Sequence, residues 1–149
     1  MSSNNDDNGQ AEFAAALDEL WRAVLRVSGR GVPGGDTELT LSQFNMLSAL
    51  GEGRSKVTEV AAAAEVAPPT ATRALRALEH RGFVERRRNA SGDGRHVRVA
   101  LTESGSKVLA EKTAWVKARQ TAIFEALTPA QRETAAQTLR AIADDLHEL

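Results

Sequence analysis

The fold of this chain is decided by residues 58–101, which read TEVAAAAEVAPPTATRALRALEHRGFVERRRNASGDGRHVRVAL. Residues 58–64 are rich in alanine and form a short helical segment, and residues 68–81 form a second one. Residues 83–88 and 95–101 then alternate in polarity around NASGDG, in which Asp93-Gly94 is a dipeptide typical of hairpin turns. The stretch predicts two helices joined by a turn and followed by a two-stranded hairpin.

Alternation along the second strand predicts an inward and an outward face. We expect Val97, Val99 and Leu101 to face inward, and His96, Arg98 and Ala100 to face outward.

Helical signals surround this stretch on both sides. Phe13, Leu17, Leu20 and Val24 recur at helical spacing before the loop GRGVPGGD. Thr40-Leu41-Ser42-Gln43 has the form of a capping box and starts a further helix, which Gly51-Glu52-Gly53 ends. A long helix is expected from Thr102 to Leu127, and a second capping box, Thr128-Pro129-Ala130-Gln131, starts the last helix.

The last helix carries one continuous apolar stripe. Large apolar side chains are otherwise scarce, since the chain has four Phe, two Trp and no Tyr among 149 residues. A subunit of this kind gains most by burying helix faces against a second copy of itself, so the sequence favours a homodimer. The stripe consists of Ala135, Leu139, Ile142, Leu146 and Leu149.

Basic charge is concentrated in the middle of a chain whose net charge is -1. Ten of its nineteen Lys and Arg residues lie between residues 54 and 98, against five carboxylates, and nine of the ten are Arg. The planar guanidinium group suits phosphate and guanine, so the distribution favours double-stranded DNA as a partner, although a solvated surface would show the same charge.

Residues 68–81 have two distinct faces when wound as a helix. Ala71, Ala74, Leu75 and Leu78 form the side expected to be buried. The outward side is polar and cationic, with small hydroxyl residues near the amino-terminal end, as in a helix that enters a DNA groove; an ordinary amphipathic surface helix has the same pattern. It consists of Pro69, Thr70, Thr72, Arg73, Arg76 and Ala77.

Several classes of function find no support. The chain has no cysteine, which excludes disulfides, thiolate metal ligands and thiol redox switches. Its three histidines, His80, His96 and His147, fall on separate elements, so we expect no metal site, no cofactor and no enzyme. The polar, acidic start MSSNNDDNGQ resembles neither a signal peptide nor a membrane anchor, and we expect a disordered tail over residues 1–10 on a cytoplasmic protein.

The motifs together resemble the MarR family of winged helix-turn-helix transcriptional regulators. The most specific are Leu78-Glu79-His80-Arg81-Gly82-Phe83-Val84-Glu85-Arg86 and Asp93-Gly94-Arg95, the latter followed by Leu101-Thr102 and Gly105. The resemblance spans roughly residues 11–149 and implies a mainly α fold with a small β-hairpin wing (α+β). It divides the chain into a winged-helix DNA-binding region, 40–101, and dimerisation helices within 11–38 and 102–149 of a single domain.

The resemblance also assigns roles to the wing. It implies that Arg95 enters the minor groove from the wing tip and that Asp93 holds this arginine in place. Arg86 and Arg88, at the base of the hairpin, are expected to contact phosphates, and alternation turns Arg87 to the other side. The turn before residues 68–81 departs from the family, because Glu65 and Ala67 stand where a glycine and a hydroxyl cap are usual. We expect a strained backbone or a different turn there.

The resulting hypothesis is a dimeric regulator, a repressor that binds an inverted-repeat operator and is released by a small organic ligand. The family favours aromatic or phenolic ligands, and the large side chains nearest the expected pocket are Trp21, Phe44, Met46 and Trp115, for which core packing is the default interpretation. A second hypothesis is a winged-helix dimer that binds proteins or small molecules without DNA.

Overall fold

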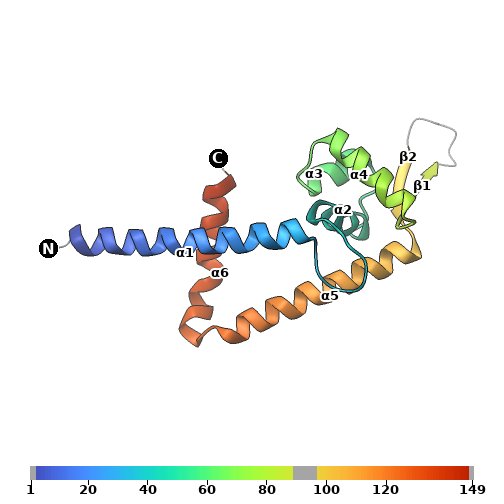
Figure 1. Cartoon of the computed structure of the whole chain (residues 1–149). Helices are drawn as coiled ribbons and strands as arrows, with labels where there is room; N and C mark the ends of the chain where they lie inside the picture. Colours follow the sequence, from blue (N-terminus) through green and yellow to red (C-terminus); the bar gives the residue numbers. More distant parts are fainter. Residues whose placement is uncertain (1–2, 89–96, 148–149) are drawn as a thin grey trace. The chain divides into compact units, whose positions relative to one another are not determined.

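The structure, a computed structural model, describes residues 3–88 and 97–147 (Figure 1). The predicted mainly helical fold with a small hairpin wing is confirmed. The elements in chain order are α1 (Ser3–Arg30), α2 (Leu41–Gly51), α3 (Val57–Ala63), α4 (Pro68–His80), β1 (Val84–Arg88), β2 (Val97–Leu101), α5 (Glu103–Ala126) and α6 (Pro129–His147).

Contacts between residues divide the chain into two compact units, Met1–Lys112 and Thr113–Leu149. Helix α1 begins at Ser3, inside the segment 1–10 for which composition predicts disorder. No helix among the described residues is long and apolar enough to cross a membrane.

Side-chain caps start the helices where the sequence predicts them. Thr40 accepts a hydrogen bond from the Gln43 N–H at 3.2 Å, and the Gln43 side chain accepts one from the Thr40 N–H at 3.0 Å. Thr128 and Gln131 make the same reciprocal pair at the start of α6, with distances of 3.3 and 2.9 Å. Both capping boxes are therefore confirmed, and each satisfies two backbone groups that a helix end would leave unpaired.

At the start of α3, the Lys56 N–H donates to the Glu59 carboxylate at 3.4 Å, and this bond holds the pKa of Glu59 below its usual value.

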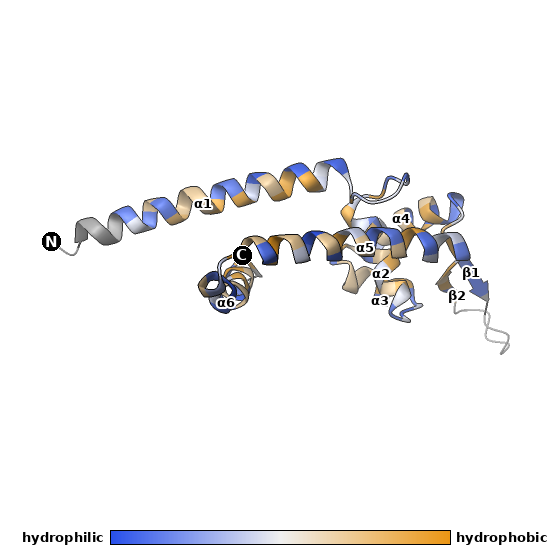
Figure 2. Ribbon diagram, turned by 90° about the horizontal axis from the view of Figure 1, so that it is seen from below, coloured by the Kyte–Doolittle hydropathy of each residue, from blue (hydrophilic) through white to orange (hydrophobic). Residues whose placement is uncertain are grey.

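The core of the first unit lies where α2, α3, α4 and the hairpin meet. Met46, Leu47, Val60, Leu75 and Leu78 are at most 1% exposed and belong to one cluster of buried residues. Burying a side chain of this size contributes roughly 1.5 to 3 kcal/mol, so these contacts fix α4 on the other helices. Beyond its first turns, helix α1 instead alternates hydrophobic and hydrophilic residues, as Figure 2 shows.

The hairpin is antiparallel and its register fixes which side chains share a face. Val84 pairs with Leu101, Arg86 with Val99, and Arg87 with Arg98. Residues directly opposite each other in an antiparallel pair point to the same side, so Arg86 shares the face of the buried Val99. Arg87 and Arg98 share the other face, which is turned away from the core.

One expectation for the second strand is corrected. Val99 is buried and Leu101 is half-buried as predicted, but Val97 is 40% exposed. Alternation assigns Val97 to the inner face correctly, yet it lies two residues farther from the base of the hairpin than Val99. The core does not extend that far.

A close contact joins the base of the hairpin to α5. A Cβ atom at Gly105 would collide with the carbonyl oxygen of Phe83. Thr102 lies beside this contact: its hydroxyl donates to the Gly82 carbonyl at 2.5 Å and accepts from the Gly105 N–H at 3.0 Å. The end of the wing is thereby tied to the first turn of α5.

The second unit consists of the end of α5 and α6. Arg132 of α6 donates to the carbonyl oxygens of Phe124 and Glu125 at 2.9 and 3.0 Å, and its guanidinium lies 4.6 Å from the centre of the Phe124 ring. These bonds and the ring contact join the start of α6 to the last turn of α5. The predicted stripe on α6 leaves Leu139 and Leu146 exposed within the single chain.

Candidate nucleic-acid interface

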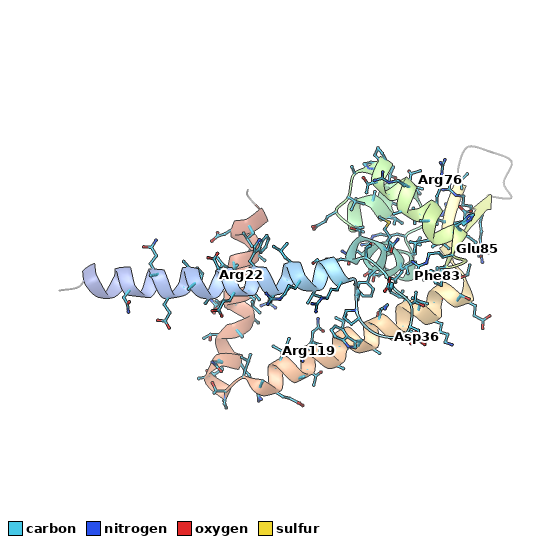
Figure 3. The ribbon with its side chains drawn as sticks, viewed as in Figure 1. Arg22, Asp36, Arg76, Phe83, Glu85 and Arg119 are labelled. Atoms are coloured by element: carbon cyan, nitrogen blue, oxygen red, sulfur yellow. The ribbon has the colours of Figure 1, made fainter. Side chains whose placement is uncertain are left out.

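Helix α4 presents the two faces that its sequence predicts. Ala71, Leu75 and Leu78 are buried, while Ala74 is only partly buried. On the opposite side Thr70, Arg73, Arg76 and their neighbours Pro69 and Ala77 are exposed, and Figure 3 labels Arg76 on this helix. The outward face therefore combines hydroxyl and guanidinium groups and carries no carboxylate between Pro69 and Ala77.

Thr72 differs from the other predicted residues of this face. It is half-buried, and its hydroxyl donates to the Pro68 carbonyl at 3.0 Å. A bond of this kind, to the carbonyl four residues earlier, is common for threonine inside helices. The Thr72 hydroxyl hydrogen is therefore used within α4, and Thr70 is the more accessible hydroxyl residue.

The turn before α4 has the unusual geometry expected from its sequence. Glu65 has a φ of 54°, the only positive φ of a non-glycine residue in the described part of the chain. Ala67 caps α4 with extended backbone and no side-chain hydrogen bond, and Pro68 and Pro69 follow as the first helical residues. A residue other than glycine in the left-handed region costs about 1 kcal/mol, so the turn is strained, as predicted.

The wing cations have distinct partners. Arg86 donates from Nε to the Glu79 carboxylate at 2.9 Å. On the outward face, Arg87 donates to Glu85 at 2.8 Å, and Arg98 donates to the Ser55 hydroxyl at 3.0 Å. Of the predicted wing residues, Arg86 is thus paired on the side of α4, the side chain of Arg88 is not described, and Asp93 and Arg95 lie outside the described residues.

Sequence reasoning placed Arg98 outward by alternation but did not name it as a candidate site residue. The signal that could have found it is the pairing register, because Arg98 lies directly opposite Arg87. The strand that carries Arg98 is also fixed to the loop before α3, since the Val99 N–H donates to the Ser55 carbonyl at 2.8 Å. Two cations therefore lie side by side on the outer face of the wing.

Arg81 was not predicted to have a role either. Its guanidinium donates to the Glu38 carbonyl at 2.7 Å and lies 4.9 Å from the centre of the Phe83 ring. It therefore fastens the end of α4 to the loop that precedes α2. No local sequence pattern could predict this contact, because Arg81 and Glu38 are 43 residues apart.

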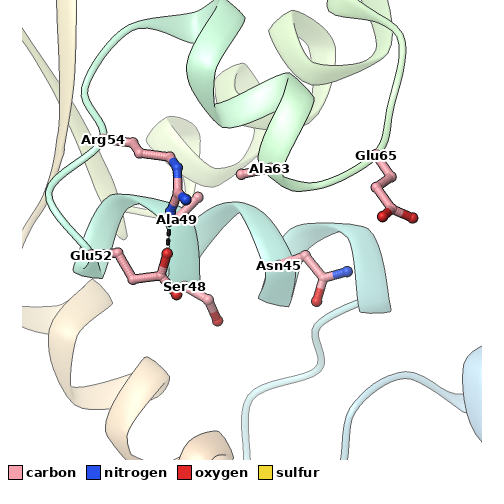
Figure 4. Close-up of a pocket in the computed structure, with 7 residues that line it drawn as sticks. All are labelled: Asn45, Ser48, Ala49, Glu52, Arg54, Ala63 and Glu65. Atoms are coloured by element: carbon pink, nitrogen blue, oxygen red, sulfur yellow. Dashed lines mark hydrogen bonds and ion pairs between the residues drawn. The ribbon is translucent and has the colours of Figure 1, made fainter. Parts of the chain in front are cut away.

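The four predicted ligand residues differ in burial and in their place in the fold. Met46 is fully buried in the core, where the default interpretation placed it, and Phe44 is partly buried. Trp21 and Trp115 are 53% and 38% exposed and belong to different units. None of the four lines the open pocket of about 390 Å³ beside α2 in Figure 4.

That pocket is polar rather than aromatic. An ion pair between Arg54 and Glu52 lies on one side of it. Its described lining consists of Asn45, Ser48, Ala49, Glu52, Arg54, Ala63 and Glu65. The described residues contain no group of three or more His, Asp or Glu side chains able to hold a metal ion.

Comparison with known proteins gives one sequence match and several structural ones. Residues 39–97 match the sequence profile of the MarR family, and no curated protein matches the chain. The structure of Lactococcus lactis ZitR in complex with DNA is 21% identical, covers 89% of this chain and 97% of that chain, and has a TM-score of 0.68. ZitR is described as a zinc-responsive MarR family member.

Two further solved structures have the same fold. Streptococcus pneumoniae FabT in complex with DNA is 19% identical, with coverage of 93% and 98% and a TM-score of 0.79. Bordetella bronchiseptica BpsR, whose DNA binding is regulated by 6-hydroxynicotinic acid, is 22% identical, with coverage of 89% and 98% and a TM-score of 0.65. Residues 39–97 thus match the MarR family, and the chain shares along most of its length the winged-helix fold of these solved structures.

Proposed function

We propose that this chain is a dimeric, sequence-specific, DNA-binding transcriptional regulator of the cytoplasm. The observation that carries the proposal is the outward face of α4, where Thr70, Arg73 and Arg76 are exposed on a helix whose opposite face is fixed in the core. Side chains on a rigid helix keep their spacing, which is what reading base edges in a major groove requires.

The residues of this face have different roles in the proposal. Arg73 and Arg76 read bases, with guanine the natural partner of a two-pronged guanidinium contact. Pro69, Thr70 and Thr72 let the start of the helix approach the sugar-phosphate backbone closely. Arg88 contacts phosphate at the wing, and Arg95, held by Asp93, inserts into the minor groove and favours A·T-rich flanks.

Dimerisation uses the terminal helices. The first helix leaves Phe13, Leu20 and Trp21 between 47% and 54% exposed, and Leu139 of α6 is 57% exposed. Apolar side chains at this density along helices are buried when a second copy packs on them. Two recognition helices related by two-fold symmetry then favour an inverted-repeat operator with half-sites about 10 bp apart.

A small aromatic or phenolic ligand releases the repressor from DNA in this proposal. Support comes from BpsR, a protein of the same fold whose DNA binding responds to a small aromatic acid. Trp21 and Phe44 in the first unit and Trp115 in the second, each taken by itself, remain the proposed aromatic contacts for such a ring, while Met46 is fully buried and not accessible to it. The chain has no cysteine, so peroxide cannot act through thiol oxidation.

Selection of bound duplexes from a random pool tests the DNA function directly. The full chain is expected to enrich an inverted repeat, and Arg73→Ala is expected to relax the preference at specific bases of each half-site. Failure to enrich any sequence would contradict the DNA proposal and favour a winged-helix dimer that binds proteins or small molecules. Adding a panel of aromatic acids to the enriched complex tests the ligand class separately.

A further inference from the structure

One ion pair joins α4, the proposed recognition helix, to the β1–β2 hairpin. Glu79 lies in the last turn of α4, and Arg86 is the third residue of β1, seven positions later. Of the four ion pairs found between described residues, this one connects α4 with the hairpin. Both side chains are partly screened from solvent, with exposed fractions of 32% for Arg86 and 38% for Glu79.

The register explains why Arg86 meets Glu79. Arg86 is paired with Val99, which is 1% exposed, so both point toward the core side of the hairpin. Arg87 and Arg98 point to the opposite side. The guanidinium of Arg86 thus lies between the hairpin and α4, and its Nε–H group donates a hydrogen bond to the Glu79 carboxylate.

We infer that Glu79 and Arg86 are positioning residues, which clamp the wing to the recognition helix. This positioning role replaces the phosphate contact that the sequence predicted for Arg86. Because DNA is bound by α4 and the wing together, the angle between them decides whether both reach their grooves at once. The inference about affinity rests on the proposed DNA-binding function.

The direction in which Glu79→Gln changes DNA affinity distinguishes the clamp from simple charge repulsion. A carboxylate close to DNA repels phosphate, so Glu79→Gln should tighten binding if Glu79 has no positioning role. If Glu79 holds the wing through Arg86, the same substitution should weaken binding. Partly exposed ion pairs of this kind limit the expected loss to about two- to fivefold.

The experiment is a double-mutant cycle on DNA affinity at several salt concentrations. E79Q, R86Q and the double variant are expected to lose similar factors, because each breaks the same pair. R86K, which keeps the charge, is expected to lose less than R86Q. R87Q is the matched control: it removes one arginine from the same strand, but on the outward face, and its effect should add to that of E79Q.

Salt dependence gives a second criterion. If Arg86 contacts a phosphate, R86Q should lower the steepness of the dependence by about one released counterion, and E79Q should strengthen binding. Tighter binding by E79Q, or additive losses in the cycle, would overturn the clamp.

The clamp is also measured without DNA, so its failure can be told apart from failure of the proposed function. In the free protein, E79Q and R86Q should speed amide hydrogen exchange in the β1–β2 ladder, while R87Q should not. Unchanged exchange in all three variants would overturn the clamp. Accelerated exchange in E79Q and R86Q, with no DNA bound by the unaltered protein, would uphold the clamp and reject the DNA function.

Discussion

Thr102→Val tests the joint between the wing and α5. The Thr102 hydroxyl donates to the Gly82 carbonyl at 2.5 Å and accepts from the Gly105 N–H at 3.0 Å, at the third residue of the helix. Valine has the same shape as threonine and a second methyl group in place of the hydroxyl. The substitution therefore removes both hydrogen bonds and leaves no cavity.

The expected loss follows from these two bonds. Replacing a threonine cap costs about 0.5 to 2 kcal/mol, and one further hydrogen bond to a backbone carbonyl contributes about 0.5 to 1.5 kcal/mol. Because Thr102 is only half-buried, water can partly replace both partners. We expect the free energy of unfolding to fall by about 1 to 3 kcal/mol.

Urea unfolding followed by circular dichroism measures this loss, at one fixed protein concentration because the proposed dimerisation would add to the apparent stability. Thr102→Ser is the matched control, since serine keeps the hydroxyl and should retain stability within about 0.5 kcal/mol. A Thr102→Val protein as stable as the unaltered chain would refute the reasoning, and so would equal losses in both variants.

Four further changes have defined outcomes. Ala67→Ser adds the missing cap to α4 and should raise the free energy of unfolding by about 1 kcal/mol in the same assay; no gain would mean that the strained turn keeps the hydroxyl from the helix. Gly105→Ala should lower it by about 1 to 3 kcal/mol, because the Phe83 carbonyl leaves no room for a Cβ, and a neutral result would contradict that close approach. Arg73→Ala should weaken operator binding by about 1 to 3 kcal/mol and relax base preference, measured by fluorescence anisotropy on matched and mismatched duplexes; a loss equal on all sequences would make Arg73 a phosphate contact. Leu139→Glu should dissociate the dimer in analytical ultracentrifugation, and a variant that stays fully dimeric would remove α6 from the interface.

Local patterns predicted the elements well because their causes are local. The capping boxes at Thr40 and Thr128 need only residues three positions apart, and the buried face of α4 follows from helical periodicity. The strain at Glu65 was also foreseeable, since glycine is the usual residue in that backbone conformation.

The candidate site was harder to predict because its geometry depends on how elements pack. Alternation predicts on which face of the strand Arg86 lies, but only the packing of the elements shows that Glu79 of α4 lies beside that face. Likewise, periodicity cannot tell where the core stops beneath the hairpin, which is why Val97 is exposed. Met46 was a pocket candidate because of its size and its place near the expected pocket, and its burial depends on α2 contacting several other elements at once.

The composition of β1 has a consequence for solubility. Within the described residues the sheet has two strands, so one edge of β1 offers unpaired backbone groups to any passing strand. The strand reads Val-Glu-Arg-Arg-Arg, and four charged side chains in five residues oppose pairing with the same strand of another copy. We therefore expect its arginines to oppose edge-to-edge aggregation of the free protein. Neutral, β-branched replacements at Arg87 and Arg88 should therefore aggregate as protein concentration rises, even when no nucleic acid is present.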